Sequence, residues 1–161
     1  MDTYRVRVGK DTHVFSAAHF ITFNGTCERL HGHNYRVAAE VEGLLDENHY
    51  VIDFIGLRDA LGEIVQRLDH HVILPTEHPQ IHVGSDENEV HVRFEKRRWV
   101  FPRDDCILLP VANTTSELLA RHIGQSLGAE LERRCGFRFS ILRIEVDECF
   151  GQVAVCELSQ D

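Results

Sequence analysis

The chain has 161 residues, which is the length of one ordinary domain. Its 17 Lys and Arg residues stand against 26 Asp and Glu residues, and the formal net charge of −9 disfavours binding of nucleic acid or of an anionic membrane. Apolar residues make up 43% of the chain, enough for a core. No apolar run reaches the roughly 20 residues of a membrane span, and the first ten residues lack a secretory signal. We therefore expect a soluble, cytoplasmic protein.

The N-terminal part of the sequence predicts two long paired strands. Apolar and charged residues alternate from Tyr4 to Val8, and the extended pattern continues to residue 20. Asn24-Gly25 marks a turn, and alternation returns over residues 33–43. The simplest arrangement is an antiparallel pair, residues 4–20 with residues 33–43, joined by a loop that carries Cys27.

Two helices are predicted, each with a capping signal. The first runs from about Phe54 to Leu68, after Asp53 as its N-cap. The second begins within residues 114–117 and ends at Gly136, which suits the left-handed position that closes a helix. Residues 139–148 and 153–158 then read as two more strands.

Between the helices, residues 76–109 carry an alternating pattern of their own. It is typical of a β-hairpin or a short meander inserted into the domain. Arg97 and Arg98 lie in this segment, and a solvated hairpin face is favoured for them over a contact with a triphosphate. The element order indicates a single α+β domain, residues 1–161, with two helices on one face of a four-stranded antiparallel sheet.

The informative stretch is the run from Cys27 to Asn34, which contains His31-Gly32-His33. On extended chain, residues i and i+2 project to the same face, so both imidazoles can reach one ion. His19, near the end of the preceding strand, can supply a third nitrogen. Three neutral imidazoles with an open fourth position describe a catalytic zinc site, although copper or nickel would bind the same set.

Three further features are candidates for acid–base chemistry or binding. Cys27 would be partly ionised near a dication and could act as a nucleophile or a base. Asp69 and His70 follow the first helix, but sequence neighbours point in different directions, and a polar helix end explains them equally well. Glu148 closes a strand, and its carboxylate can clamp a heterocycle through two parallel N–H bonds.

Together these residues resemble the 6-pyruvoyl-tetrahydropterin synthase / 6-carboxytetrahydropterin synthase family. The match runs in order along nearly the whole chain, except for residues 76–109. Its pieces are Phe15 to His19, Cys27 to Asn34, Val51 to Phe54, Leu68 to His71, Thr115 to Glu117, and Glu148.

The resemblance implies the tunnelling fold (T-fold), in which three subunits close a barrel and two trimers stack into a hexamer with active sites at subunit interfaces. It also implies a homo-oligomer that binds Zn²⁺ through His19, His31 and His33 and takes 7,8-dihydroneopterin triphosphate as its pterin substrate. Departures from the family pattern are Leu118 in place of Asn, Cys149 in place of Thr, and the larger segment 76–109.

By the same resemblance, the remaining site residues receive roles. Cys27 is the proton acceptor, Asp69 and His70 form a relay, and Glu148 anchors the pterin and couples to that relay. Thr115 and Glu117 lie near the pterin ring. The three residues between Cys27 and His31 resemble the carboxy-forming enzymes of queuosine and deazapurine biosynthesis, whereas the pyruvoyl-forming enzymes have a longer gap.

Two other classes of protein are weighed against this reading. A cysteine hydrolase using Cys27 and His70 would need no metal and leaves His31-Gly32-His33 unexplained. A zinc-binding or assembly module without catalysis would keep the metal and be indifferent to the loss of Cys27.

Overall fold

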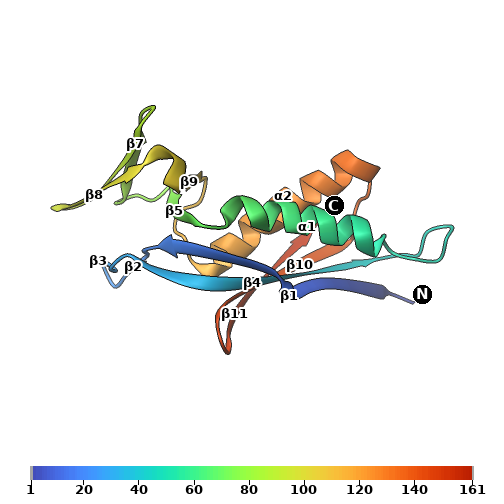
Figure 1. Ribbon diagram of the computed structural model, residues 1–161. Helices are drawn as coiled ribbons and strands as arrows, with labels where there is room; N and C mark the ends of the chain where they lie inside the picture. Colours follow the sequence, from blue (N-terminus) through green and yellow to red (C-terminus); the bar gives the residue numbers. More distant parts are fainter. Residues whose placement is uncertain (1, 161) are drawn as a thin grey trace.

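Two helices lie on one face of a mixed β-sheet, and a small second sheet stands at one end of it, in a computed structural model that describes residues 2–160 (Figure 1). The strands and helices, in chain order, are β1 (Tyr4–His19), β2 (Thr22–Phe23), β3 (Thr26–Cys27), β4 (His31–Gly43), α1 (Phe54–Leu68), β5 (His71–Pro75), β6 (His82–Ser85), β7 (Glu89–Phe94), β8 (Arg97–Pro102), the 3₁₀ turn η1 (Arg103–Asp105), β9 (Cys106–Leu109), α2 (Ser116–Cys135), β10 (Ile141–Cys149) and β11 (Gln152–Ser159).

The main sheet has the strand order β11-β10-β4-β1-β5-β9 within the described residues. The four strands expected from the sequence pair antiparallel, as β11 with β10, β10 with β4 and β4 with β1. The expectation of a four-stranded antiparallel sheet is incomplete, however, because β5 and β9 extend it through parallel pairings. Both strands are short apolar runs without alternation, and such runs carry no period from which a strand can be predicted.

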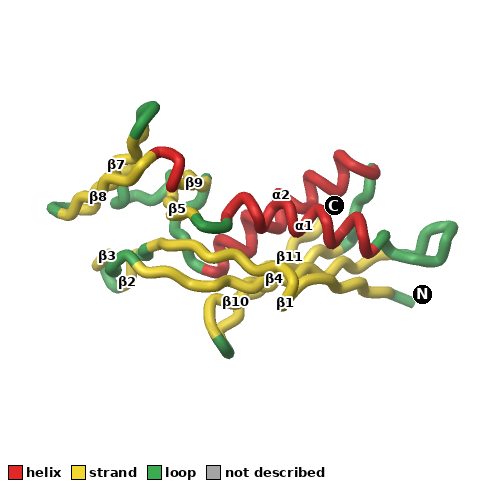
Figure 2. The backbone as a smooth tube through the Cα atoms, in the orientation of Figure 1, coloured by secondary structure: helices red, strands yellow, loops and turns green. Residues whose placement is uncertain are grey.

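Both predicted helices are confirmed, together with their caps. The Asp53 carboxylate accepts hydrogen bonds from the amides of Ile55 and Gly56 at the start of α1. Thr115 caps α2, and Gly136 ends that helix with φ +64°. Figure 2 shows both helices above the same face of the main sheet. Within residues 2–160, neither helix is long and apolar enough to cross a membrane.

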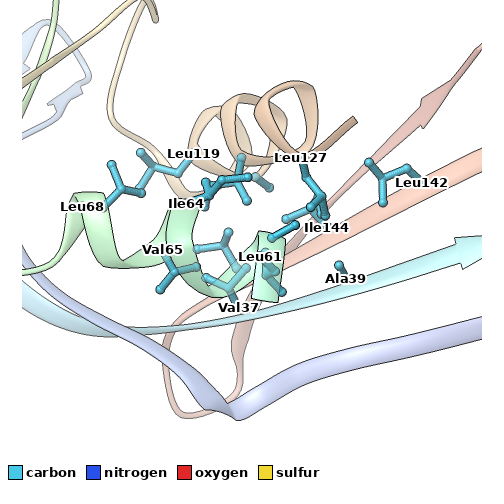
Figure 3. Packing of buried hydrophobic residues seen from close by; sticks show 14 of the residues in the cluster. Val37, Ala39, Leu61, Ile64, Val65, Leu68, Leu119, Leu127, Leu142 and Ile144 are labelled. Carbon is cyan, nitrogen blue, oxygen red and sulfur yellow. The ribbon is translucent and has the colours of Figure 1, made fainter. Parts of the chain in front are cut away.

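The main core lies between the helices and the sheet. Leu61 and Val65 of α1 and Leu127 of α2 meet Val37 of β4 and Ile144 of β10 in one apolar cluster (Figure 3). Burial of each large aliphatic side chain contributes about 1.5–3 kcal/mol to the free energy of unfolding. This layer packs on β1 and β4, and those two strands carry the histidines.

A second apolar cluster joins the small sheet to the rest of the chain. Strands β6, β7 and β8 form an antiparallel three-stranded meander within residues 76–109. Its apolar face packs against Phe20 and Cys27 as well as against Leu74 of β5. In Figure 1, β8 extends over the end of the sheet where β2 and β3 lie. The meander therefore contacts the loop between β1 and β4 through Phe20 and Cys27.

Candidate metal centre

The pairing of β1 with β4 brings the three predicted histidines together. His19 lies directly opposite His31, and Ala17 lies opposite His33, so all three imidazoles project from the same face. A Cβ on Gly32 would lie 3.2 Å from the Ala17 carbonyl oxygen, closer than an ordinary contact. The glycine spacer thus allows the two strands to approach at this point.

The structure adds a carboxylate to the three imidazoles. One ligand atom from each of His19, His31, His33 and Glu148 lies within 4.8 Å of the others. The ring centroids of the histidines are 4.8–5.2 Å apart. Imidazole nitrogens and a carboxylate oxygen are the donor set of many zinc sites, and this group offers three or four ligands.

Hydrogen bonds to the other ring nitrogens orient two of these imidazoles. Nδ1 of His19 lies 2.9 Å from the Thr114 carbonyl oxygen, and Nδ1 of His31 lies 2.8 Å from the Arg29 carbonyl oxygen. A carbonyl only accepts, so each Nδ1 donates and each Nε2 keeps its lone pair. Nε2 of His33 is buried and lies 3.0 Å from a Glu148 oxygen. The two atoms do not have the geometry of a hydrogen bond, so this nitrogen has no hydrogen-bond partner within the described residues. These residues therefore fit a divalent metal ion.

The protonation state of His19 also favours ligation. Burial lowers its pKa to about 4, against a smaller opposing effect of the hydrogen bond to Thr114. The ring is therefore neutral at pH 7 and can bind a metal without first losing a proton. The buried Tyr35 hydroxyl lies 3.2 Å from His19 Nε2, and burial raises the pKa of this phenol, so it stays protonated.

We expect the metal-free protein to lose stability in mild acid because of His19. The pKa of His19 is lowered from 6.5 to about 4 in the folded protein. Below pH 6.5 the imidazole therefore binds a proton in the unfolded chain but not in the folded one. The contribution is complete above pH 6.5 and falls by about 3 kcal/mol as the pH reaches 4. Urea unfolding at several pH values, with a chelator present, measures this slope.

A His19→Gln variant is the matched comparison for this pH dependence. Burial also lowers the pKa of His78 and of His122, so both add to the slope of the natural protein. The difference between the two proteins isolates His19, and equal slopes between pH 6.5 and 4 would contradict the assignment.

Glu148 is held at the edge of a cleft. One of its oxygens accepts a hydrogen bond from the Ser116 hydroxyl at 2.7 Å, and the other faces His33. The cleft has a volume of about 710 Å³ and is lined by His33, Asn34 and Glu148 among others. A carboxylate in this position can bind a metal or receive N–H groups of a ligand that enters the cleft.

Asp69 and His70 form a contact that the sequence did not assure. Oδ2 of Asp69 lies 2.9 Å from Nδ1 of His70, and its other oxygen accepts from the Ser16 amide at 2.7 Å. The left-handed backbone of His70, φ +60°, lets the ring turn back towards the preceding residue. Both hydrogen bonds lower the pKa of Asp69 below its usual value, and the one from the Ser16 amide has the larger effect. His70 and His33 line one cavity of about 500 Å³.

Cys27, Thr115 and Glu117 are not brought into the four-residue group. The Cys27 side chain is 8% exposed and packs in the second apolar cluster, where burial raises the pKa of the thiol. The Thr115 hydroxyl caps α2 by accepting from the Leu118 amide, and Glu117 is exposed.

Sequence reasoning missed three residues that touch the group. Thr114 orients His19, Ser116 holds Glu148, and the Tyr35 hydroxyl contacts His19. Thr114 and Ser116 belong to a hydroxyl-rich stretch that reads as a helix cap, and a cap signal hides any second role. Tyr35 reads as a core residue in the strand pattern, and its hydroxyl gives no separate signal.

Comparison with known proteins places the chain in a family. The model of the 6-pyruvoyl tetrahydropterin synthase family matches residues 9–159. A Methanocaldococcus jannaschii protein, provisionally named 6-carboxy-5,6,7,8-tetrahydropterin synthase, is 29% identical over 141 residues, covering 87% of this chain and 86% of that protein. A Pyrococcus horikoshii protein with the same provisional name is 35% identical over 120 residues, covering 72% and 70%.

Solved structures agree with the sequence comparison. Two structures of Plasmodium vivax 6-pyruvoyltetrahydropterin synthase are described as catalytic residue variants, with a glutamate replaced by alanine in one and by cysteine in the other. Each superimposes with a TM-score of 0.90 at 27% identity, over 99% of this chain and 100% of that one. The chain belongs to the 6-pyruvoyl tetrahydropterin synthase family.

Proposed function

We propose that this protein is a zinc-dependent, 6-carboxytetrahydropterin synthase-like lyase. It would convert 7,8-dihydroneopterin triphosphate into 6-carboxy-5,6,7,8-tetrahydropterin, with loss of acetaldehyde and triphosphate. The observation that carries the proposal is the convergence of three imidazoles and Glu148 on one point at the edge of a cleft. The Methanocaldococcus jannaschii and Pyrococcus horikoshii proteins, which bear the name of the carboxy-forming enzyme, support this choice of product.

His19, His31 and His33 would hold the metal. Zinc bound there supplies Lewis-acid chemistry, which makes C–H protons next to a coordinated oxygen more acidic. His19 and His31 present Nε2 because the Thr114 and Arg29 carbonyls accept from their Nδ1 atoms. These two histidines are thereby fixed in the tautomer that leaves Nε2 free to bind a metal.

The other site residues would bind the substrate and move protons. Glu148, held by Ser116, would accept the N–H groups of the pterin, and Thr115 and Glu117 would lie near its ring. Asp69 orients His70, which is exposed and can exchange protons with a ligand in the cavity that it shares with His33. Cys27 would be the proton acceptor.

A second candidate for the proton acceptor is Glu28. Cys27 is buried in an apolar cluster, whereas the glutamate that follows it is partly exposed. The Plasmodium vivax structures, in which a catalytic glutamate is replaced, add weight to this alternative.

The test is to incubate the zinc-loaded protein with 7,8-dihydroneopterin triphosphate and to identify the products by mass spectrometry. Acetaldehyde together with a carboxypterin is the expected result, and a pyruvoyl product would select the alternative reaction of the family, elimination of triphosphate. A metal-free preparation that remained fully active on another substrate would favour a cysteine hydrolase. Turnover of no dihydropterin would contradict both pterin reactions and leave a metal-binding module.

The proposal includes assembly of several copies of this chain into an oligomer. The edge strand β11 exposes Val153 and Val155, and Phe23, Leu30 and Phe150 are exposed apolar residues elsewhere on the chain. An unpaired edge and exposed apolar side chains are typical of surfaces that pair with another subunit. We propose a homo-oligomer, a trimer or a hexamer, and sedimentation velocity on the assayed preparation measures this. An active monomer would contradict an active site formed between two subunits.

A further inference from the structure

Strands β6 to β8, within residues 82–102, form a meander that packs on the loop carrying both candidate proton acceptors. Arg97, the first residue of β8, reaches this loop with its guanidinium. One of its terminal nitrogens, Nη1, donates to the carbonyl oxygen of Cys27 at 2.5 Å and to that of Glu28 at 3.2 Å. The two residues are separated from Arg97 by about 70 positions in the chain, so only the packing of the meander brings the groups together.

The guanidinium is itself held in place by an aromatic stack. Its central carbon lies 4.6 Å from the centre of the Trp99 ring, a cation–π geometry. The Trp99 ring is stacked on Phe20, with centroids 4.5 Å apart and planes 19° from parallel. Phe20 directly follows the metal-ligand candidate His19. The stack therefore links Arg97 to the end of β1 where the histidine cluster begins.

The loop has few other internal restraints. Its ladder consists of the two-residue strands β2 and β3, and the Glu28 amide donates to the Ile21 carbonyl at 2.9 Å. Asn24 and Gly25 at the tip are exposed, with positive φ. A two-stranded hairpin of this size has little stability of its own, so contacts from outside it decide its position.

Arg98 offers an internal comparison. Both arginines are expected on a solvated hairpin face, and both are exposed in the structure. The Arg98 side chain makes no hydrogen bond or ion pair within the described residues 2–160, whereas the Arg97 guanidinium reaches the loop. Because neighbouring residues on a strand project to opposite faces, only Arg97 is directed at the loop.

We propose that Arg97 is a positioning residue, which fixes the backbone of Cys27 and Glu28 relative to the three histidines. Its catalytic consequence rests on the proposed function, because only there do Cys27 and Glu28 move protons. The two carbonyls accept from one planar, fixed group, and a lysine at this position has neither the flat surface to stack on Trp99 nor the same fork of donors. The β6–β8 meander thereby becomes a support of the site rather than a peripheral addition.

The experiment compares Arg97→Gln and Arg97→Lys with the matched control Arg98→Gln, all in the zinc-loaded full chain. Amide hydrogen exchange, followed by mass spectrometry of a peptide covering residues 22–30, reports on the loop directly. We expect exchange there to become about tenfold faster in both Arg97 variants and unchanged in the control, with metal content preserved in all three.

Turnover of the dihydropterin gives the second readout. A misplaced acid–base group lowers kcat by about 10- to 100-fold, while KM should change little because the ligands that hold the substrate are intact. Retention of part of the lost kcat in Arg97→Lys relative to Arg97→Gln would support a positioning role. Loss of metal in step with kcat would indicate a general structural defect and would overturn it.

The two readouts separate failure of this proposal from failure of the proposed function. If no dihydropterin is turned over, the proposed function fails, and the exchange rates still decide whether Arg97 holds the loop. Equal exchange in the Arg97→Gln and Arg98→Gln proteins overturns the proposal whatever the assays show. Faster exchange with an unchanged kcat overturns the claim that the position of the loop matters for proton transfer.

Discussion

Replacing His31 with alanine should abolish both metal binding and turnover. His31 contributes one of three imidazoles, and its Nε2 is left available by the hydrogen bond from Nδ1 to the Arg29 carbonyl. Even changes to groups behind a metal ligand cost about 10–100-fold in affinity, so loss of the ligand itself should cost on the order of 100-fold or more. Elemental analysis of the dialysed variant and the product assay measure the two effects.

The matched control is His91→Ala. His91 is an exposed histidine on the meander strand β7, and its ring lies 3.6 Å from carboxylates of Asp86 and Glu89. Its removal should leave metal content and turnover unchanged. The assignment of the metal centre would be wrong if His31→Ala kept a full complement of tightly bound metal, or if His91→Ala lost as much metal as His31→Ala.

Replacing Cys27 with alanine should nearly eliminate formation of the carboxypterin while leaving zinc in place. Removal of a general base lowers kcat by about 10²–10⁴-fold. The thiol lies outside the four-residue group, so the metal ligands remain complete. Burial raises the pKa of this thiol, and the positive charge of Arg97 offsets that effect only in part, while the negative charge of Glu28 adds to it.

Glu28→Gln is the counterpart of this variant. It removes the neighbouring carboxylate but keeps the shape of the side chain, and we expect less than about a tenfold loss of carboxypterin formation from it. A large loss in Glu28→Gln with a small loss in Cys27→Ala would assign the proton acceptor to Glu28. Indifference of turnover to both changes would remove both residues from the chemistry.

Features that depend on local sequence were predicted correctly. Helix α1 begins after the expected cap Asp53, and α2 begins after Thr115, within the stretch 114–117 where its start was expected. Such signals are local because a capping side chain and the amides it accepts from lie within three residues. The alternation over β1 and β4 likewise gave the strands, and the spacing of His31 and His33 placed both rings on one face.

Features that depend on long-range packing were not predicted. The strands β5 and β9 join the sheet through parallel pairings with segments far away in the chain. The resemblance paired Asp69 with His70, but the left-handed backbone of His70 in which this local contact forms is indicated by no sequence pattern. Arg97 is exposed, as expected, but the fold of the meander also directs its guanidinium at the Cys27 and Glu28 carbonyls.

The sequence by itself determined the donors: three imidazoles at spacings that suit one cation, a thiol, two carboxylates and the strands and helices that carry them. Residue type and local periodicity are properties of short stretches of sequence, so they can be recognised without knowing the fold. Only the tertiary structure decided how the donors are used. It placed Glu148 against His33, kept Cys27 apart in an apolar cluster, and supplied Thr114, Ser116 and Arg97 as supports. These contacts join residues 32 to 115 positions apart, and their geometry depends on how whole layers pack.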